Sequence, residues 1–93
     1  MILLMLTLRL HAPWCHSLKD KRSQVKRLTA RLHSTFNVSA CEVGEQDIHT
    51  IIEIGVAAIA FDSAQADSIA ENVLAFVEAN TEAEVVSVEK EFR

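Results

Sequence analysis

The sequence predicts an α+β sandwich in which two helices cover one face of a four-stranded antiparallel sheet. Apolar residues follow the two-residue period of a half-buried strand in three segments and, more loosely, in a fourth. In two longer segments they recur every three or four residues, as on an amphipathic helix. The order along residues 1–93 is strand, helix, strand, strand, helix, strand. With two right-handed crossovers, this order gives a single ferredoxin-like domain.

The first strand is predicted over residues 2–10, where every even position is apolar. This opening is rich in apolar residues, but Arg9 and Pro13 interrupt it before it reaches the length of a membrane span. It also lacks the order of a secretory signal peptide, which is a basic start, an apolar middle and a small-residue cleavage site. We therefore expect a cytoplasmic protein with no membrane contact.

The first helix is predicted to begin at Ser17, because Ser17 and Asp20 form a Ser-x-x-Asp pattern that caps a first turn. About five turns follow. The apolar stripe of this helix consists of Leu18, Val25, Leu28 and Leu32.

The same helix carries most of the basic charge of the chain. Six of the nine lysines and arginines lie between Lys19 and Arg31, although the net charge of the chain is −4. We expect a cationic surface made by Lys19, Arg22, Lys26, Arg27 and Arg31. Such a surface attracts phosphate groups with strong salt dependence and weak sequence selectivity. The alternative is a solvated basic helix beside acidic neighbours.

Lys21 differs from the other basic residues, because its helical phase puts it on the apolar stripe. We expect its ammonium group to extend past the end of the core into water. The alternative is an ion pair with a carboxylate such as Glu42 or Asp47. The helix start, with Ser17, Lys19 and Lys21, is also a candidate anion site, although no glycine-rich phosphate loop accompanies it.

The second half of the chain predicts a hairpin, a helix and a last strand. Residues 36–43 form an edge strand whose buried face the pattern leaves open, and residues 48–61 form a long strand after a turn. A second, acidic helix begins at Asp62 or Ser63 and ends near residue 80. Residues 85–92 complete the sheet.

One face of the predicted sheet carries no helix. The apolar residues expected there are Leu3, Met5, Ile51, Ala57, Ile59 and Val85. An exposed patch of this kind favours self-association into a homodimer. The alternative is that the long hairpin folds over part of the patch and the chain stays monomeric. No aromatic residue is expected on this face, which excludes the base stacking used by sheet-face RNA readers.

No constellation for catalysis or metal binding is found in the sequence. Ser17 is explained as a helix cap rather than a nucleophile, and His49 is a lone histidine near a turn. Side chains that could bind a metal ion are grouped in the sequence at His11, Cys15 and His16. This group lacks the paired spacing of a structural zinc site. Cys15 and Cys41 form no paired motif, so we expect reduced thiols. We expect no cofactor, no metal and no enzymatic activity.

Several motifs together resemble a known family. They are His11, Pro13, Ser17, Leu18, Lys19, Lys21, Arg22, the run Phe36, Asn37, Val38 and Ser39, then Glu42, Val43, Gln46 and Asp47, and finally Gly55, Val56 and Ala57. In these residues the chain resembles the YlxP-like family of small bacterial proteins. The resemblance implies a ferredoxin-like fold. It also implies a protein whose biochemical role is not established.

In many bacteria, genes of this family lie beside those of a translation initiation factor and a ribosome-binding factor. The resemblance thus implies association with RNA or the ribosome. Relatives often carry a tryptophan and an arginine after the position of Asp47, where this chain has His49 and Ile51. We predict a non-enzymatic protein that binds RNA or the ribosome through its cationic surface. The alternative is a homodimeric interaction module that uses the open sheet face and has no nucleic-acid role.

Overall fold

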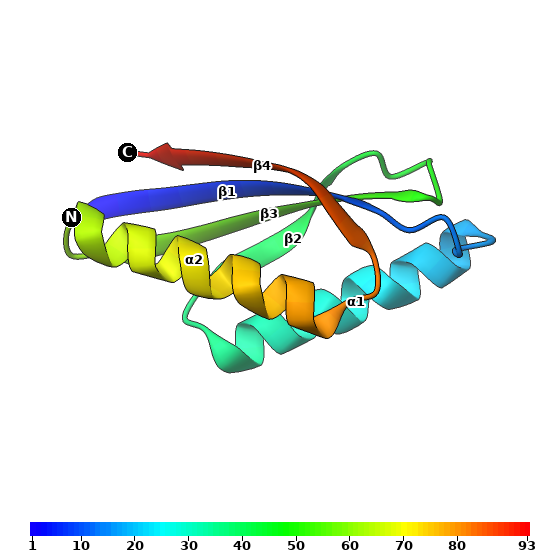
Figure 1. The fold of residues 1–93 in the computed structure, drawn as a ribbon, viewed down its shortest axis with the longest axis horizontal. Coiled ribbons are helices and arrows are strands. Elements are labelled where there is room, and N and C mark those ends of the chain that lie inside the picture. Colours follow the sequence, from blue (N-terminus) through cyan, green and yellow to red (C-terminus); the bar gives the residue numbers. More distant parts are fainter.

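Six elements in the order β-α-β-β-α-β make up the computed structural model, which describes residues 1–93 (Figure 1). They are β1 (Ile2–His11), α1 (Leu18–Thr35), β2 (Ser39–Gly44), β3 (Ile51–Ala60), α2 (Ser63–Asn80) and β4 (Glu84–Phe92). The strands form one antiparallel sheet in the order β2-β3-β1-β4. Both helices lie on the same side of the sheet (Figure 1). The predicted ferredoxin-like α+β fold is therefore confirmed.

The core lies between the sheet and the two helices. Strand residues that are no more than 2% exposed are Leu4, Leu6, Leu8, Leu10, Ile52, Ile54, Val56 and Ala60. The helix residues that pack on them include Leu28, Leu32, Val73 and Val77. Successive strand side chains point to opposite faces, so the two-residue period of β1 and β3 puts one complete apolar face under the helices.

Both helices begin at side-chain caps. The Ser17 hydroxyl accepts a hydrogen bond from the Asp20 amide at 3.1 Å, and the Asp20 carboxylate accepts one from the His16 amide at 3.1 Å. The predicted Ser17 cap is confirmed, but the Asp20 carboxylate reaches back to the amide of His16 rather than to that of the capping residue, as a strict capping box would require. In α2 the Asp62 carboxylate accepts from the Gln65 amide at 2.9 Å. Neither helix combines the length and the apolar character that crossing a bilayer requires.

The structure identifies the buried face of β2, which the sequence left open. Ala40 and Glu42 pair with buried residues of β3 and face the helices, whereas Cys41 and Val43 lie on the open face. β2 begins three residues later than the sequence predicted and ends one residue later, whereas β3 is three residues shorter at the hairpin end. Residues 45–50 form a loop there instead of extending the ladder.

A β-bulge in β4 changes the expected position of Val85. Ser87 pairs with Arg9 but Val85 pairs with Leu10, so Val86 is an extra residue that has no partner in the ladder. Because Leu10 faces the helices, Val85 does so too and packs against the core. The prediction that Val85 lies on the open sheet face is wrong, since strict alternation takes no account of an inserted residue.

Candidate nucleic-acid interface

Exposed basic side chains gather on α1. Exposed members of this cationic surface are Lys19, Arg22, Lys26, Arg27 and Arg31. The ion pairs of the protein use Arg9, Lys21, Lys90 and Arg93 as cations. None of the five residues of the cationic surface takes part in an ion pair. The charges of these five residues are therefore not neutralised by carboxylates of the same molecule, in contrast to Lys21 of the same helix.

One half of the cationic surface lies on the flank of α1 next to β2. Arg22, Lys26 and His33 fall within about 40° of one another around the helix axis. His33 fixes the direction of this flank, because its Nε2 accepts a hydrogen bond from the Ala40 amide of β2 at 3.0 Å. Arg22 and Lys26 thus extend beside the edge strand of the sheet.

The other half faces the end of α2. Arg27 and Arg31 are one turn apart and line a hollow of about 340 Å³ between the two helices. We call it the α1–α2 hollow, and its other side-chain lining includes Trp14, Gln24, Asn80 and Glu82. Trp14, in the loop before α1, is 37% exposed. The hollow could not be found in the sequence, because α1 and the end of α2 meet only in the folded chain.

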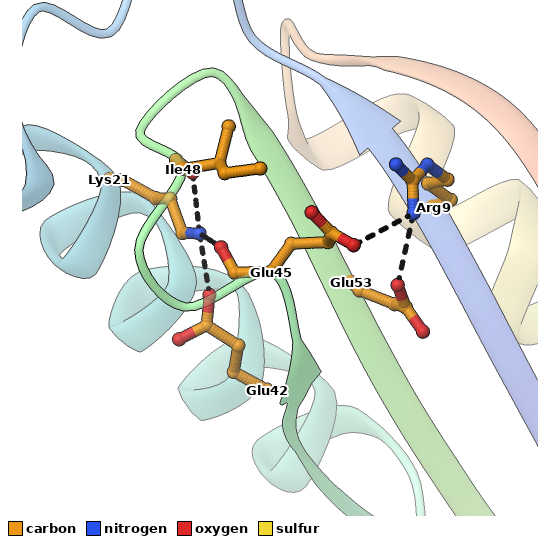
Figure 2. A network of polar contacts seen from close by, with 6 residues as sticks. All are labelled: Arg9, Lys21, Glu42, Glu45, Ile48 and Glu53. Carbon is orange, nitrogen blue, oxygen red and sulfur yellow. Dashed lines mark hydrogen bonds and ion pairs between the residues drawn. The ribbon is translucent and has the colours of Figure 1, made fainter.

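Lys21 does not extend into water but lies in a buried polar network (Figure 2). The residue is 1% exposed, and its ammonium group donates hydrogen bonds to the carbonyl oxygens of Glu45 and, at 2.7 Å, Ile48. The Nζ also lies 3.0 Å from Oε2 of Glu42 and forms an ion pair with this carboxylate. The expectation of a solvated ammonium group is wrong, and the alternative of an ion pair with Glu42 is correct.

The same network corrects the proposed anion site at the start of α1. Lys21 is buried and directs its ammonium group to three oxygens of the hairpin, so it is not available to a bound anion. The Ser17 hydroxyl caps the helix, and the carboxylate of Asp20 occupies the first turn and would repel an anion. Of the three expected ligands, only Lys19 is exposed and unpaired.

Arg9 connects the β2–β3 loop to the sheet on its open side (Figure 2). Its guanidinium lies 3.2 Å from a carboxylate oxygen of Glu53 and 3.5 Å from one of Glu45. Glu45 has a φ of 57°, a backbone conformation in which few residues other than glycine are found. Sequence reasoning missed this group, because Arg9 and Glu53 become neighbours only when β1 pairs with β3.

The open sheet face is apolar in its centre and acidic along β4. The expected residues that do lie there are Leu3, Met5, Ile51, Ala57 and Ile59. Ile59 is 69% exposed and Leu3 is 38% exposed. Glu89 and Glu91 lie on the same face, because they pair with odd-numbered residues of β1.

The two cysteines have different surroundings. Cys15 is buried, and this burial raises the pKa of its thiol. The charge of Asp20 raises that pKa further, while Lys21 acts in the opposite direction. Cys41 is exposed on the open sheet face, and neither thiol is in a disulfide.

Comparison with known proteins agrees with the resemblance seen in the motifs. The sequence profile of a family described as "Protein of unknown function (DUF503)" matches residues 3–90. The chain belongs to the DUF503 family. This DUF503 protein is also similar to the uncharacterized protein YlxP of Bacillus subtilis (strain 168), with 38% identity over 68 residues. The aligned part covers 73% of this chain and 74% of the relative.

Proposed function

We propose that this DUF503 protein binds RNA, free or within the ribosome, through the cationic surface of α1. The observation that carries the proposal is that five exposed cations on one helix have no carboxylate partner. Unpaired lysines and arginines are available to displace the counterions of a phosphate backbone, and this displacement supplies most of the affinity of non-specific RNA binding. No catalytic group is required for this role.

The charges of the rest of the molecule orient the RNA. The net charge is −4 even with the bases of α1 included. The outer surface of α2 is acidic, because it carries the exposed residues Asp67, Glu71 and Glu78. An approaching polyanion is attracted only toward α1 and is repelled by the remaining surface, including Glu89 and Glu91 on the open sheet face.

The direct test is a charge reversal on the flank beside β2. We expect Arg22→Glu with Lys26→Glu to weaken strongly both the binding to a labelled single-stranded RNA and the co-sedimentation with ribosomes. The matched control is Lys90→Glu with Arg93→Glu, which changes the net charge equally but lies on and after β4, away from α1. The control should retain both activities. Circular dichroism melting curves of both variants would establish that they are folded.

The salt dependence supplies a second measure of the same proposal. Each phosphate contact with single-stranded nucleic acid contributes roughly 0.7 to the slope of log K against log salt concentration. Loss of two contacts should therefore lower the slope by roughly 1.4. Equal affinity and equal slope for the α1 variant and the wild type at low salt would refute the proposal.

A second candidate function, self-association through the open sheet face, is favoured by the exposure of its apolar centre. An apolar hollow of about 290 Å³ crosses this face beside Met5, Val43 and Ala57. A homodimer would cover this surface without any role for RNA. Sedimentation velocity at high protein concentration should then detect a dimer that Ile59→Glu converts to a monomer. A wild-type protein that stays monomeric would exclude this candidate.

A further inference from the structure

The α1–α2 hollow combines groups that bind different parts of a nucleotide. Trp14 offers an aromatic ring, Arg27 and Arg31 offer two guanidinium groups, and Asn80 and Glu82 offer hydrogen-bond acceptors. Arg27 and Arg31 are unpaired although the carboxylate of Glu82 lines the same hollow. The cationic side therefore retains its charge for a ligand.

We propose that this hollow holds one unpaired nucleotide of the bound RNA, with its base against Trp14 and a phosphate on Arg27 and Arg31. The inference rests on the proposed function and adds that the RNA is single-stranded where it meets α1. Stacking of a base on an aromatic side chain requires a base that is free of its helix, because bases inside a duplex are already stacked.

The size of the hollow agrees with this ligand. Its volume of about 340 Å³ lies at the lower end of the range of small-molecule sites, about 300–1,000 Å³. This volume suits a single nucleotide rather than a base pair. An RNA strand that continues past the hollow reaches Lys26 and Arg22 on the other flank of α1, so the two halves of the cationic surface act on one strand.

The polar groups of the hollow fix the direction of the nucleotide. The Nδ2 of Asn80 donates to the Phe76 carbonyl at 2.9 Å, which leaves its Oδ1 as an acceptor. The carboxylate of Glu82 is a second acceptor and repels phosphate, so the phosphate lies at the arginines and the base points toward α2. Acceptors favour a base with an exocyclic amino group. Cytosine has such a group at the position where uracil has a carbonyl oxygen.

Trp14 makes the proposal directly testable, because it is the one tryptophan of the chain. Its fluorescence reports on this hollow and on no other site. Titration of the intact protein with a short oligocytidylate should quench the fluorescence, whereas a duplex RNA of equal length should bind without quenching. Oligocytidylate should bind roughly fivefold or more tighter than oligouridylate, the least expected from one base contact.

Variants separate stacking from charge. Trp14→Ala should weaken the binding of labelled oligocytidylate roughly fivefold or more, and Trp14→Phe should retain most of the affinity. Arg27→Ala with Arg31→Ala should abolish the preference for cytosine and the quenching. The matched control, Arg22→Ala with Lys26→Ala, removes the same charge from the other flank. It should lower the affinity but reach full quenching at saturation.

The outcomes distinguish failure of this inference from failure of the proposed function. RNA binding that leaves Trp14 fluorescence unchanged and is insensitive to Trp14→Ala would overturn the hollow as the nucleotide site and leave the proposed function intact. Cytidine monophosphate that quenches as tightly as the oligonucleotide would also overturn it, because the strand would then contribute nothing. Absence of RNA binding in every titration would refute the proposed function itself.

Discussion

Replacement of Lys21 with methionine tests whether the buried network between α1 and the β2–β3 loop stabilises the fold. Methionine has a similar length but carries no charge and no donor. The substitution leaves the Glu42 carboxylate, whose side chain is 15% exposed, without its cation. It also leaves the carbonyl oxygens of Glu45 and Ile48 without the donor that now binds them.

The expected destabilisation is large for a domain of this size. Removing one partner of a buried ion pair costs about 3–5 kcal/mol, since the remaining charge stays in a poorly solvated place. Small domains unfold with a free energy of about 5–15 kcal/mol, so Lys21→Met should consume a large part of the stability. At about 4–8 °C per kcal/mol, the melting temperature should fall by roughly 12–40 °C.

The assay is urea unfolding followed by circular dichroism, with Lys90→Met as the matched control. Lys90 lies 2.8 Å from Asp67, but both side chains are about half exposed, so this ion pair contributes little. The control should lose less than about 1 kcal/mol. Lys21→Met combined with Glu42→Leu should be more stable than Lys21→Met alone, because no buried charge is then left unpaired.

The reasoning would be refuted if Lys21→Met were as stable as Lys90→Met. It would also be refuted if the double variant were less stable than Lys21→Met alone. Either result would mean that the carboxylate and the carbonyl groups find water when the ammonium is absent.

Four further predictions concern packing, thiol reactivity, the pH dependence of stability and helix capping. A Cβ on Gly55 would lie 2.6 Å from Cγ1 of Val43, so Gly55→Ala should lower the free energy of unfolding by about 1–3 kcal/mol, and Val43→Ala in the same chain should restore most of it in thermal melts. Cys41 should react with a thiol reagent at neutral pH, whereas Cys15 should react only on unfolding. Because the pKa of Cys15 is raised in the folded state, its contribution to stability is present below the unfolded-state pKa and lost at higher pH, so Cys15→Ala should reduce alkaline destabilisation. Asp62→Ala should cost about 1 kcal/mol, measured by urea unfolding.

Local sequence determined the helices and strands of this protein. The hydroxyl of Ser17 and the carboxylate of Asp20 meet amides within four residues, so the start of α1 depends on no other part of the chain. The alternation in β1 likewise identifies its buried face without reference to a partner strand. The order of the elements and the handedness rule for crossovers then leave few arrangements, of which the ferredoxin-like fold is one.

The tertiary structure decided what the residue pattern around Val85 and Lys21 leaves open. An inserted residue in β4 moves Val85 to the opposite face of the sheet. The alternation of apolar residues does not reveal this insertion, because a bulge is defined only by the pairing with the neighbouring strand. The environment of Lys21 depends on the β2–β3 hairpin, which is distant in sequence and brings one oxygen of β2 and two of the loop to the Lys21 nitrogen.

The candidate interface was determined partly by the local sequence and partly by the tertiary structure. Helical phase alone put the five bases of the cationic surface outside the core, because the direction of a side chain follows from its position in the helix. That they have no acidic partner, and that Arg27 and Arg31 share a hollow with Trp14 and Glu82, follows from where α2 ends beside α1. Periodicity acts over a few residues and fixes which side chains are exposed. Only the packing of distant segments fixes which of them meet.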